Sequence, residues 1–289
     1  MILTLMNKGN FSVLMTTYHG ETPEFLDASL NSILVDQTCV PDQLVLAVDG
    51  PIPDTLDEVI KRYKSKFQEE LDVVYLPVNQ GQSKASAEGF KYIRHEIFAR
   101  MDSDDLCVST RFERELEILN KGEVEVVGGW IAEFDNDCEK ADSLRIVPER
   151  HEDIEKMFRK RMPLNNVTVM MKKSAVEKAG GYGRATVNED YSLYVRMWVN
   201  GARFYNIPEV LCKVRIGNDM VGRRQDFRIY KDWKKDQRYL RENGKHTRFS
   251  EFVSNSRCFL FIITPKWVKK ILYKLVLRKK VNKKFKNEE

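Results

Sequence analysis

The sequence predicts an α/β fold built around a mostly parallel β-sheet. Four short apolar runs rich in β-branched residues occur in the first hundred residues, and segments of helical periodicity separate them. Strands that alternate with helices at this spacing are typical of right-handed β-α-β units. The 289 residues are enough for one large domain or two small ones, each with its own core. The four expected strands are 11–17, 43–48, 71–76 and 96–101.

Two helices of this first half have recognisable beginnings. Thr22 precedes Pro23 and predicts the N-cap of a helix that leads to the second strand. Thr110 with Glu113 predicts a capping box ahead of a helix that follows the fourth strand. In an open parallel sheet connected in this way, ligands bind at the carboxyl ends of the strands.

The second half has a less regular pattern, which predicts a mixed sheet. Strands are expected at 125–134, 166–173, 202–207 and 210–216, and helices at 151–161 and 190–201. We expect a catalytic domain over residues 1–219, followed by a basic helical region over residues 220–289. No internal repeat and no low-complexity linker marks a further boundary.

Composition excludes several classes of protein. The hydrophobic fraction of 42% and the charged fraction of 31% indicate a globular chain rather than a disordered one. The five cysteines lie far apart and are odd in number, which favours neither a disulfide framework nor a zinc site and fits a reducing cytoplasm. The apolar stretch at the N-terminus is too short for a signal peptide, so we expect no export.

The segment MDSDD, residues 101–105, ends the fourth expected strand with a cluster of carboxylates. Asp102 and Asp104 are two residues apart and point to the same side of an extended backbone, where they repel each other unless a cation lies between them. A solvated turn with a helix cap is the plain alternative. The position at a strand end favours a divalent ion that binds a nucleotide diphosphate. No glycine-rich phosphate loop is present to do this instead.

Five segments in order carry a family resemblance: FSVLMTTYHGE, VDGP, NQGQSKASAEGF, MDSDD and AGGYGRATVNEDYSLYVRMWVNG. Together they resemble the family 2 glycosyltransferases, which have the GT-A fold, over roughly residues 10–216. The most similar group known to us builds the O-antigen and capsule repeat units of bacteria. The resemblance implies a Rossmann-like nucleotide-binding sheet, a UDP-sugar donor and a Mn²⁺ or Mg²⁺ ion.

The resemblance also assigns roles to individual residues. Asp104 and Asp102 would bind the metal, and Asp190, with Glu189 as the second choice, would be the catalytic base. The residues implied at the nucleotide-sugar are Thr17, Tyr18, Glu21, Asp49, Asn79, Gly81, Lys84, Asp102, Ser103 and Trp130. Each has an ordinary structural alternative, such as a turn former for Asp49 or a core residue for Trp130. Arg223 and Arg224 are candidates for binding a diphosphate.

A single base without a protein nucleophile indicates direct displacement with inversion, so a UDP-α-sugar would give a β-linkage. We expect transfer of galactose or glucose to a saccharide on undecaprenyl diphosphate. A nucleotidyltransferase shares such a sheet and its acids, but its glycine-rich first loop is absent from TTYHGETPEF, residues 16–25. A non-catalytic UDP-binding module at the membrane is a third possibility, against which the intact acidic motifs argue.

Residues 220–289 are strongly basic, with 21 Lys and Arg against 7 Asp and Glu. Around Trp267 the sequence predicts an amphipathic helix with lysines opposite an apolar arc, which is typical of an interfacial helix on anionic lipid. Its lysines are too frequent for a membrane-spanning helix. We expect a cytoplasmic protein, peripheral on the inner membrane, that does not bind nucleic acid. A helix packed on the catalytic domain is the alternative.

Overall fold

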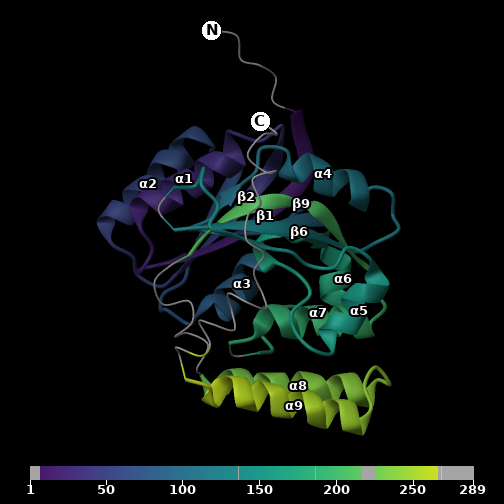
Figure 1. Cartoon of the computed structure of the whole chain (residues 1–289). Helices are drawn as coiled ribbons and strands as arrows, with labels where there is room; N and C mark the ends of the chain where they lie inside the picture. Colours follow the sequence, from purple (N-terminus) through teal and green to yellow (C-terminus); the bar gives the residue numbers. More distant parts are fainter. Residues whose placement is uncertain (1–6, 136, 186, 217–225, 266–267, 269–289) are drawn as a thin grey trace.

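The computed structural model describes residues 7–135, 137–185, 187–216, 226–265 and 268 (Figure 1). The strands are β1 Asn7–Tyr18, β2 Cys39–Asp49, β3 Leu71–Tyr75, β4 Ile97–Asp102, β5 Leu106–Cys107, β6 Val126–Phe134, β7 Ser143–Arg145, β8 Met170–Lys172 and β9 Phe204–Arg215. The helices are α1 Pro23–Leu34, α2 Asp54–Lys66, α3 Gln82–Phe90, α4 Arg111–Leu119, α5 His151–Phe158, the short 3₁₀ helix η1 Asn166–Thr168, α6 Lys173–Lys178, α7 Glu189–Val199, α8 Phe227–Glu242 and α9 Arg248–Ile263.

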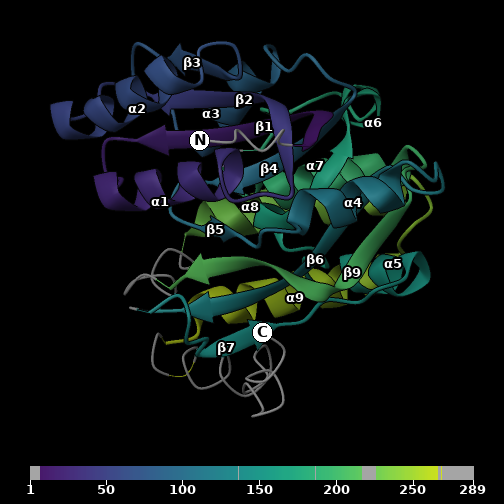
Figure 2. The same ribbon diagram turned by 90° about the horizontal axis from the view of Figure 1, so that it is seen from above.

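One mixed sheet runs through the described chain in the order β3-β2-β1-β4-β8-β6-β9-β5, and β7 pairs with β6 (Figure 2). The strands from β3 to β4 are parallel, as the alternating pattern predicts. From β8 onward the directions are mixed, since β8 is antiparallel to both neighbours and β9 is parallel to β6. The predicted α/β fold with a mixed second half is therefore confirmed.

Apolar residues bury both faces of this sheet. Helices α1, α2 and α4 cover one face with side chains such as Leu30 and Phe112, which are fully buried. Helices α3, α5 and α7 lie on the other face, where Phe158 and Trp198 stack with ring centroids 5.4 Å apart (Figure 1). Because both faces are covered, the open edge at the carboxyl ends of the parallel strands is left for binding.

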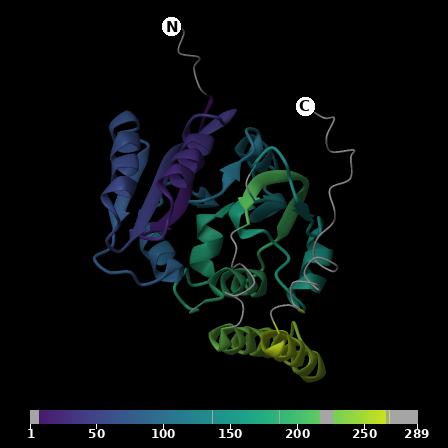
Figure 3. The same ribbon diagram turned by 60° about the vertical axis from the view of Figure 1, so that its left-hand side comes forward.

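Helices α8 and α9 form a hairpin beneath α7 and make the outermost layer of the molecule (Figure 3). Trp233 of α8 stacks on Tyr191 of α7 with ring centroids 4.6 Å apart. The hydroxyl of Ser192 donates a hydrogen bond of 2.9 Å to Asp236. Helix α8, in the basic region, therefore packs closely on α7, and the division at residue 219 stays a prediction. The predicted amphipathic helix around Trp267 lies outside the described residues, except for Val268.

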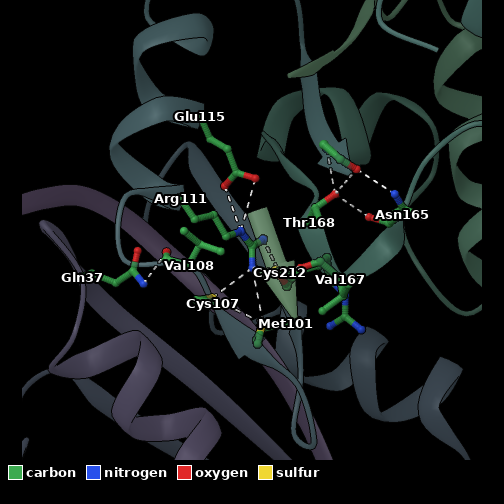
Figure 4. A network of polar contacts seen from close by, with 12 residues as sticks. Gln37, Met101, Cys107, Val108, Arg111, Glu115, Asn165, Val167, Thr168 and Cys212 are labelled. Carbon is green, nitrogen blue, oxygen red and sulfur yellow. Dashed lines mark hydrogen bonds and ion pairs between the residues drawn. The ribbon is translucent and has the colours of Figure 1, made fainter. Parts of the chain in front are cut away.

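A buried arginine supports the turn between β4 and β5 (Figure 4). Arg111 pairs with Glu115 at 3.2 Å, and its Nη2 donates to the backbone oxygen of Arg100 at 2.9 Å. Its Nη1 lies 3.2 Å from the sulfur atoms of both Cys107 and Cys212. Buried charge is tolerated only when it is paired and hydrogen-bonded. This cluster fixes the two strands that flank the acidic motif.

Several local predictions were wrong. No capping box forms at α4, because Glu113 accepts a hydrogen bond from the Thr38 hydroxyl at 2.8 Å and Thr110 makes no side-chain cap. The prediction that Thr22 is the N-cap of α1 is confirmed, although its hydroxyl makes no capping hydrogen bond. The strands expected at 202–207 and 210–216 are one strand, β9, whose register with β6 shifts near Trp130. The strand expected at 166–173 begins as η1 and continues as β8.

Candidate active site

Three parallel strands end side by side at one edge of the sheet. In its register, Tyr18 on β1 lies beside Asp49 on β2, and Thr16 on β1 lies beside Asp102 on β4. Ligands bind at this edge in open parallel sheets. The strand order thus brings together candidate residues that are far apart in the sequence.

The turn after β4 holds its three carboxylates in different environments. Asp102 accepts a hydrogen bond from Gln82 Nε2 at 3.2 Å, and Asp104 is half-buried. Asp105 is buried and accepts a hydrogen bond of 2.9 Å from the backbone N–H of Arg215. Burial raises the pKa of Asp105 well above its usual value, and the charges of Asp104 and Asp102 raise it further. Asp105 therefore ties the turn to β9, and Asp102 and Asp104 are the candidate metal ligands.

The loop between β1 and α1 is fastened to this turn by Glu21. Its carboxylate accepts hydrogen bonds from the Ser103 hydroxyl and, at 2.8 Å, from the backbone N–H of Thr22. Tyr18, the last residue of β1, is 46% exposed, so its ring is accessible to a planar ligand. Thr17 is buried, and its hydroxyl has no partner among the described residues.

Asp49 shapes the loop that leads into α3. Its two carboxylate oxygens each accept a hydrogen bond of 2.8 Å, one from the backbone N–H of Gln80 and one from that of Gly81. The side-chain amide of Asn79 donates to the backbone oxygen of Asp49 at 3.1 Å. Gly81 has a φ of +89°, a conformation that glycine adopts readily, and α3 begins at the next residue. The predicted contact of Asp49 with the nucleotide stays a prediction.

Two other candidates, Lys84 and Trp130, line neither cavity, and two more cannot be placed. Lys84 is exposed on α3 and lines neither of the two cavities described below. Trp130 also lines neither, and its indole N–H donates to the backbone oxygen of Val147 at 3.2 Å. Arg223 and Arg224 fall outside the described residues.

Two cavities meet at the N-terminus of α7. The first, of 660 Å³, has polar walls from α3, the start of α7 and the start of α8. The second, of 460 Å³, lies between α5, α7 and α9. Three residues line both cavities: Val187, Asp190 and Ile229. Asp190 is the only carboxylate that does so among the residues that the structure describes.

Glu189, the neighbour of Asp190, is occupied by structural contacts. It is buried and accepts hydrogen bonds from the Ser83 hydroxyl at 2.9 Å and from the backbone N–H groups of Gly183 at 3.0 Å and Ala185 at 2.9 Å. Arg196 pairs with it at 3.5 Å. The oxygens of Glu189 are therefore occupied by contacts that hold the loop before α7 in place.

Asp190 has the electrostatic setting of a general base. Withdrawal from water raises the pKa of its carboxyl to about 7, the Arg100 guanidinium opposes this, and the charges of Asp102 and Glu189 add to it. In the described chain no hydrogen bond restrains its carboxylate. A base works best when its pKa is near the pH at which it operates. Between the two acids, the geometry favours Asp190.

The first cavity also contains residues that the sequence analysis did not single out. Gln82, Ser83 and Ser86 line it from α3, and Asp226 and Arg228 line it from the start of α8. The three α3 residues lie in the segment NQGQSKASAEGF, residues 79–90. Their polar side chains at the start of a helix were the signal that could have identified them. Residues 226 and 228 carried no local signal, since only tertiary packing brings α8 to this cavity.

The residues at the end of β4 fit a divalent cation. Within the described residues no group of three His, Cys, Asp or Glu side chains is placed to hold a metal. Mg²⁺ does not require one, because it is commonly held by one or two carboxylates and completes its shell with water and substrate phosphates. Asp102 and Asp104 offer two such carboxylates, whose charges already disfavour ionisation of Asp105. This mutual repulsion is what a cation would relieve.

Comparison with known proteins agrees with this geometry. The model of glycosyl transferase family 2 matches residues 12–178, which is more than half of the chain. The chain belongs to glycosyltransferase family 2. The match includes β1 to β4 and the acidic turn, so the candidate residues at the strand ends lie within the family domain.

Relatives of this glycosyltransferase include enzymes of bacterial polysaccharide synthesis. The amylovoran biosynthesis glycosyltransferase AmsE of Erwinia amylovora is 36% identical, with 76% of this chain and 82% of the relative covered. An Escherichia coli enzyme named UDP-Gal:alpha-D-GlcNAc-diphosphoundecaprenol beta-1,3-galactosyltransferase is 30% identical, with 93% and 97% covered. The crystal structure of Staphylococcus aureus TarS 1–349 with UDP-GlcNAc has a TM-score of 0.63 at 17% identity, covering 93% of this chain and 76% of that one, which shows the shared fold.

Proposed function

We propose that this glycosyltransferase transfers galactose or glucose from the UDP-sugar to a saccharide carried on a polyprenyl diphosphate, in the assembly of a bacterial surface polysaccharide. The observation that carries the proposal is the position of Asp190 in the wall shared by two cavities. A base there can meet a donor sugar in one cavity and an acceptor hydroxyl in the other. The named donor and acceptor of the Escherichia coli relative support this choice of substrates.

The donor would bind along the strand ends. The accessible ring of Tyr18 suits stacking on uracil, and the loop of Asn79 and Gly81 would enclose the nucleoside. Asp102 and Asp104 would hold a Mn²⁺ or Mg²⁺ ion. When bound, the ion neutralises charge that develops on the leaving diphosphate.

Asp190 removes the proton from the acceptor hydroxyl. The hydroxyl oxygen forms a bond to the anomeric carbon while the bond from that carbon to the diphosphate breaks, and UDP leaves. A single displacement inverts the anomeric centre, so an α-linked donor gives a β-glycoside. The charge of the buried Arg100 guanidinium favours the ionised form of Asp190, which keeps the base usable near neutral pH.

Attachment to the inner face of the inner membrane is part of the proposal. The lipid-linked acceptor is confined there, and the basic residues 220–289 would attract anionic lipid. The outer side of α9 exposes apolar residues that this contact would cover: Phe249, Phe252, Phe259, Leu260 and Ile263. None of the helices in the described chain is both apolar and long enough to span a bilayer.

A donor screen tests the proposed function. The purified protein with Mn²⁺ is given a synthetic lipid-diphosphate N-acetylglucosamine and, in turn, UDP-Gal, UDP-Glc, UDP-GlcNAc and GDP-mannose. We expect transfer from a UDP-hexose, with a β-linkage in the product by NMR, and none from GDP-mannose. A product with an α-linkage, or transfer from GDP-mannose alone, would show the proposal to be wrong.

A further inference from the structure

The 460 Å³ cavity adjoins Asp190 and is the one that lies away from α3. Its walls come from segments far apart in the sequence, namely β7 and the chain after it, α5, α7, the first turn of α8, and α9. Asp190 is the only carboxylate in this lining as far as the structure describes it. Because the acceptor hydroxyl must reach Asp190, this cavity is placed to hold the part of the acceptor that follows the reacting sugar.

Two guanidinium groups line the cavity, from Arg145 at the end of β7 and Arg161 just after α5. Arg161 is exposed, its Nε lies 3.4 Å from the sulfur of Met157, and it forms no ion pair within the described residues. Arg145 donates from Nη2 to the backbone oxygen of Leu164 at 3.4 Å. Guanidinium groups bind phosphate oxygens in a planar, bidentate manner. Two of them at one cavity suit a group that carries more than one phosphate charge.

Helix α9 lies in the outermost layer of the molecule (Figure 3) and carries apolar side chains toward the cavity and toward solvent. Cys258, Phe261 and Ile262 line the cavity. The residues next to them face outward, with exposed fractions of 41% for Phe259, 58% for Leu260 and 52% for Ile263. Apolar side chains of α9 therefore occur both in the cavity lining and on the exposed side of the same helix.

We propose that this cavity binds the junction of the acceptor, with the diphosphate on Arg145 and Arg161 and the first isoprenoid units against α9. The inference rests on the proposed function, since it takes Asp190 as the base. An uncharged saccharide would offer the Arg161 guanidinium no anionic partner. A purely nucleotide ligand would place polar groups against the side chains of Met157 and Met162. The lipid diphosphate satisfies both walls.

Arg161→Gln tests the charge, with Lys160→Gln as the matched control, because Lys160 is adjacent, exposed and outside the cavity lining. Transfer is measured to the same N-acetylglucosamine carried either on a lipid diphosphate or as an octyl glycoside without phosphate. We expect Arg161→Gln to raise the KM for the diphosphate acceptor about tenfold and to leave the octyl glycoside unchanged. Lys160→Gln should change neither value, and UDP should bind equally to all three proteins.

Cys258→Trp tests the apolar wall by filling it. Its binding of the lipid diphosphate is measured by calorimetry without any donor, alongside UDP binding and the melting temperature. We expect acceptor binding to fall at least about tenfold while UDP binding stays as in the wild type. If this variant failed to fold, the Arg161→Gln result would still decide. Because binding needs no turnover, a wild type that bound the lipid diphosphate but transferred no hexose would contradict the proposed reaction and support the cavity assignment.

Three results would overturn the inference. A loss of UDP affinity in Arg161→Gln would assign this guanidinium to the donor. An equal loss with both acceptors would show a structural role without recognition of diphosphate. Unchanged binding of the lipid diphosphate in both variants would place the acceptor elsewhere.

Discussion

The two cavities that meet at Asp190 differ in how they are built. The donor cavity takes its walls largely from consecutive residues at the start of α3 and at the start of α7. The proposed acceptor cavity draws scattered side chains from α5, β7, α7, α8, α9 and the loops between them, most of them apolar. In the proposed reaction the first cavity would hold the donor sugar against polar groups, whereas the second would recognise the acceptor mainly by its shape and by two guanidinium groups. Polar chemistry therefore concentrates in short motifs, and apolar recognition is spread over the fold.

Asp190→Asn tests whether the wall between the cavities is where the reaction takes place. Asn preserves the shape but cannot accept the proton, so we expect kcat to fall about 10³-fold. The Kd for UDP should change by less than about twofold, since only the transfer step is affected. Product formation and calorimetry measure the two quantities. A fully active Asp190→Asn beside an inactive Glu189→Gln would move the base to Glu189.

Asp104→Ala tests whether a metal ion held by this carboxylate is needed for transfer. Loss of this carboxylate should lower kcat about 10²-fold in Mn²⁺, because charge on the diphosphate is no longer neutralised. Asp105→Asn is the matched control, since this neighbour contacts the backbone of Arg215 and should retain both activity and metal dependence. Full activity of the wild type in chelator would remove the metal from the mechanism.

The pH dependence examines Asp190 directly. A carboxylate base is active when deprotonated, and the pKa of about 7 means that half of the molecules are in that form at pH 7. We therefore expect kcat/KM to rise with pH through this region and to fall about tenfold for each unit below about pH 6. A cation near Asp102 shifts the midpoint downward, because positive charge favours the ionised form. A flat profile between pH 5 and 8 would exclude Asp190 as the base.

The sequence was sufficient for the parallel half of the fold but not for the contacts that decide individual roles. Alternating apolar runs predict β1 to β4, and their parallel pairing places Tyr18, Asp49 and Asp102 at one edge. Nothing local distinguishes Asp105, which bonds to Arg215, from Asp104, because the partner lies on a distant strand. The capping box was predicted wrongly for the same reason: Glu113 accepts a hydrogen bond from Thr38, which lies in a distant segment of the sequence.

Glu189→Gln should act on stability more than on chemistry. The amide keeps one acceptor oxygen but turns an NH₂ group toward the donors that now bond to the carboxylate, and it loses the pairing with Arg196. We expect a loss of ~1–3 kcal/mol in the free energy of unfolding and less than about a tenfold change in kcat. Urea unfolding and single-turnover kinetics measure both. An unchanged unfolding curve with abolished transfer would contradict the structural role.

Substitutions on the exposed side of α9, where we propose that the protein contacts the membrane, should have the smallest effect on the transfer reaction. Replacing Phe259, Leu260 and Ile263 by Ser removes exposed apolar surface next to the cavity without touching its lining. Sedimentation with anionic vesicles should fall by about tenfold or more, because each buried apolar side chain contributes ~1 kcal/mol or more to attachment. Transfer to a water-soluble acceptor should be unchanged.

The matched control replaces Phe249 and Phe252, which are more exposed but lie in the first half of the same helix, away from the cavity. We expect this pair to matter less, because the acceptor emerges at the other end of α9, where the basic tail follows. High salt should weaken attachment of the wild type without abolishing it, since screening reduces charge attraction but not apolar burial. If salt alone released the wild type completely, or if the Ser triple variant sedimented like it, charge would hold the protein at the membrane and α9 would serve only the cavity.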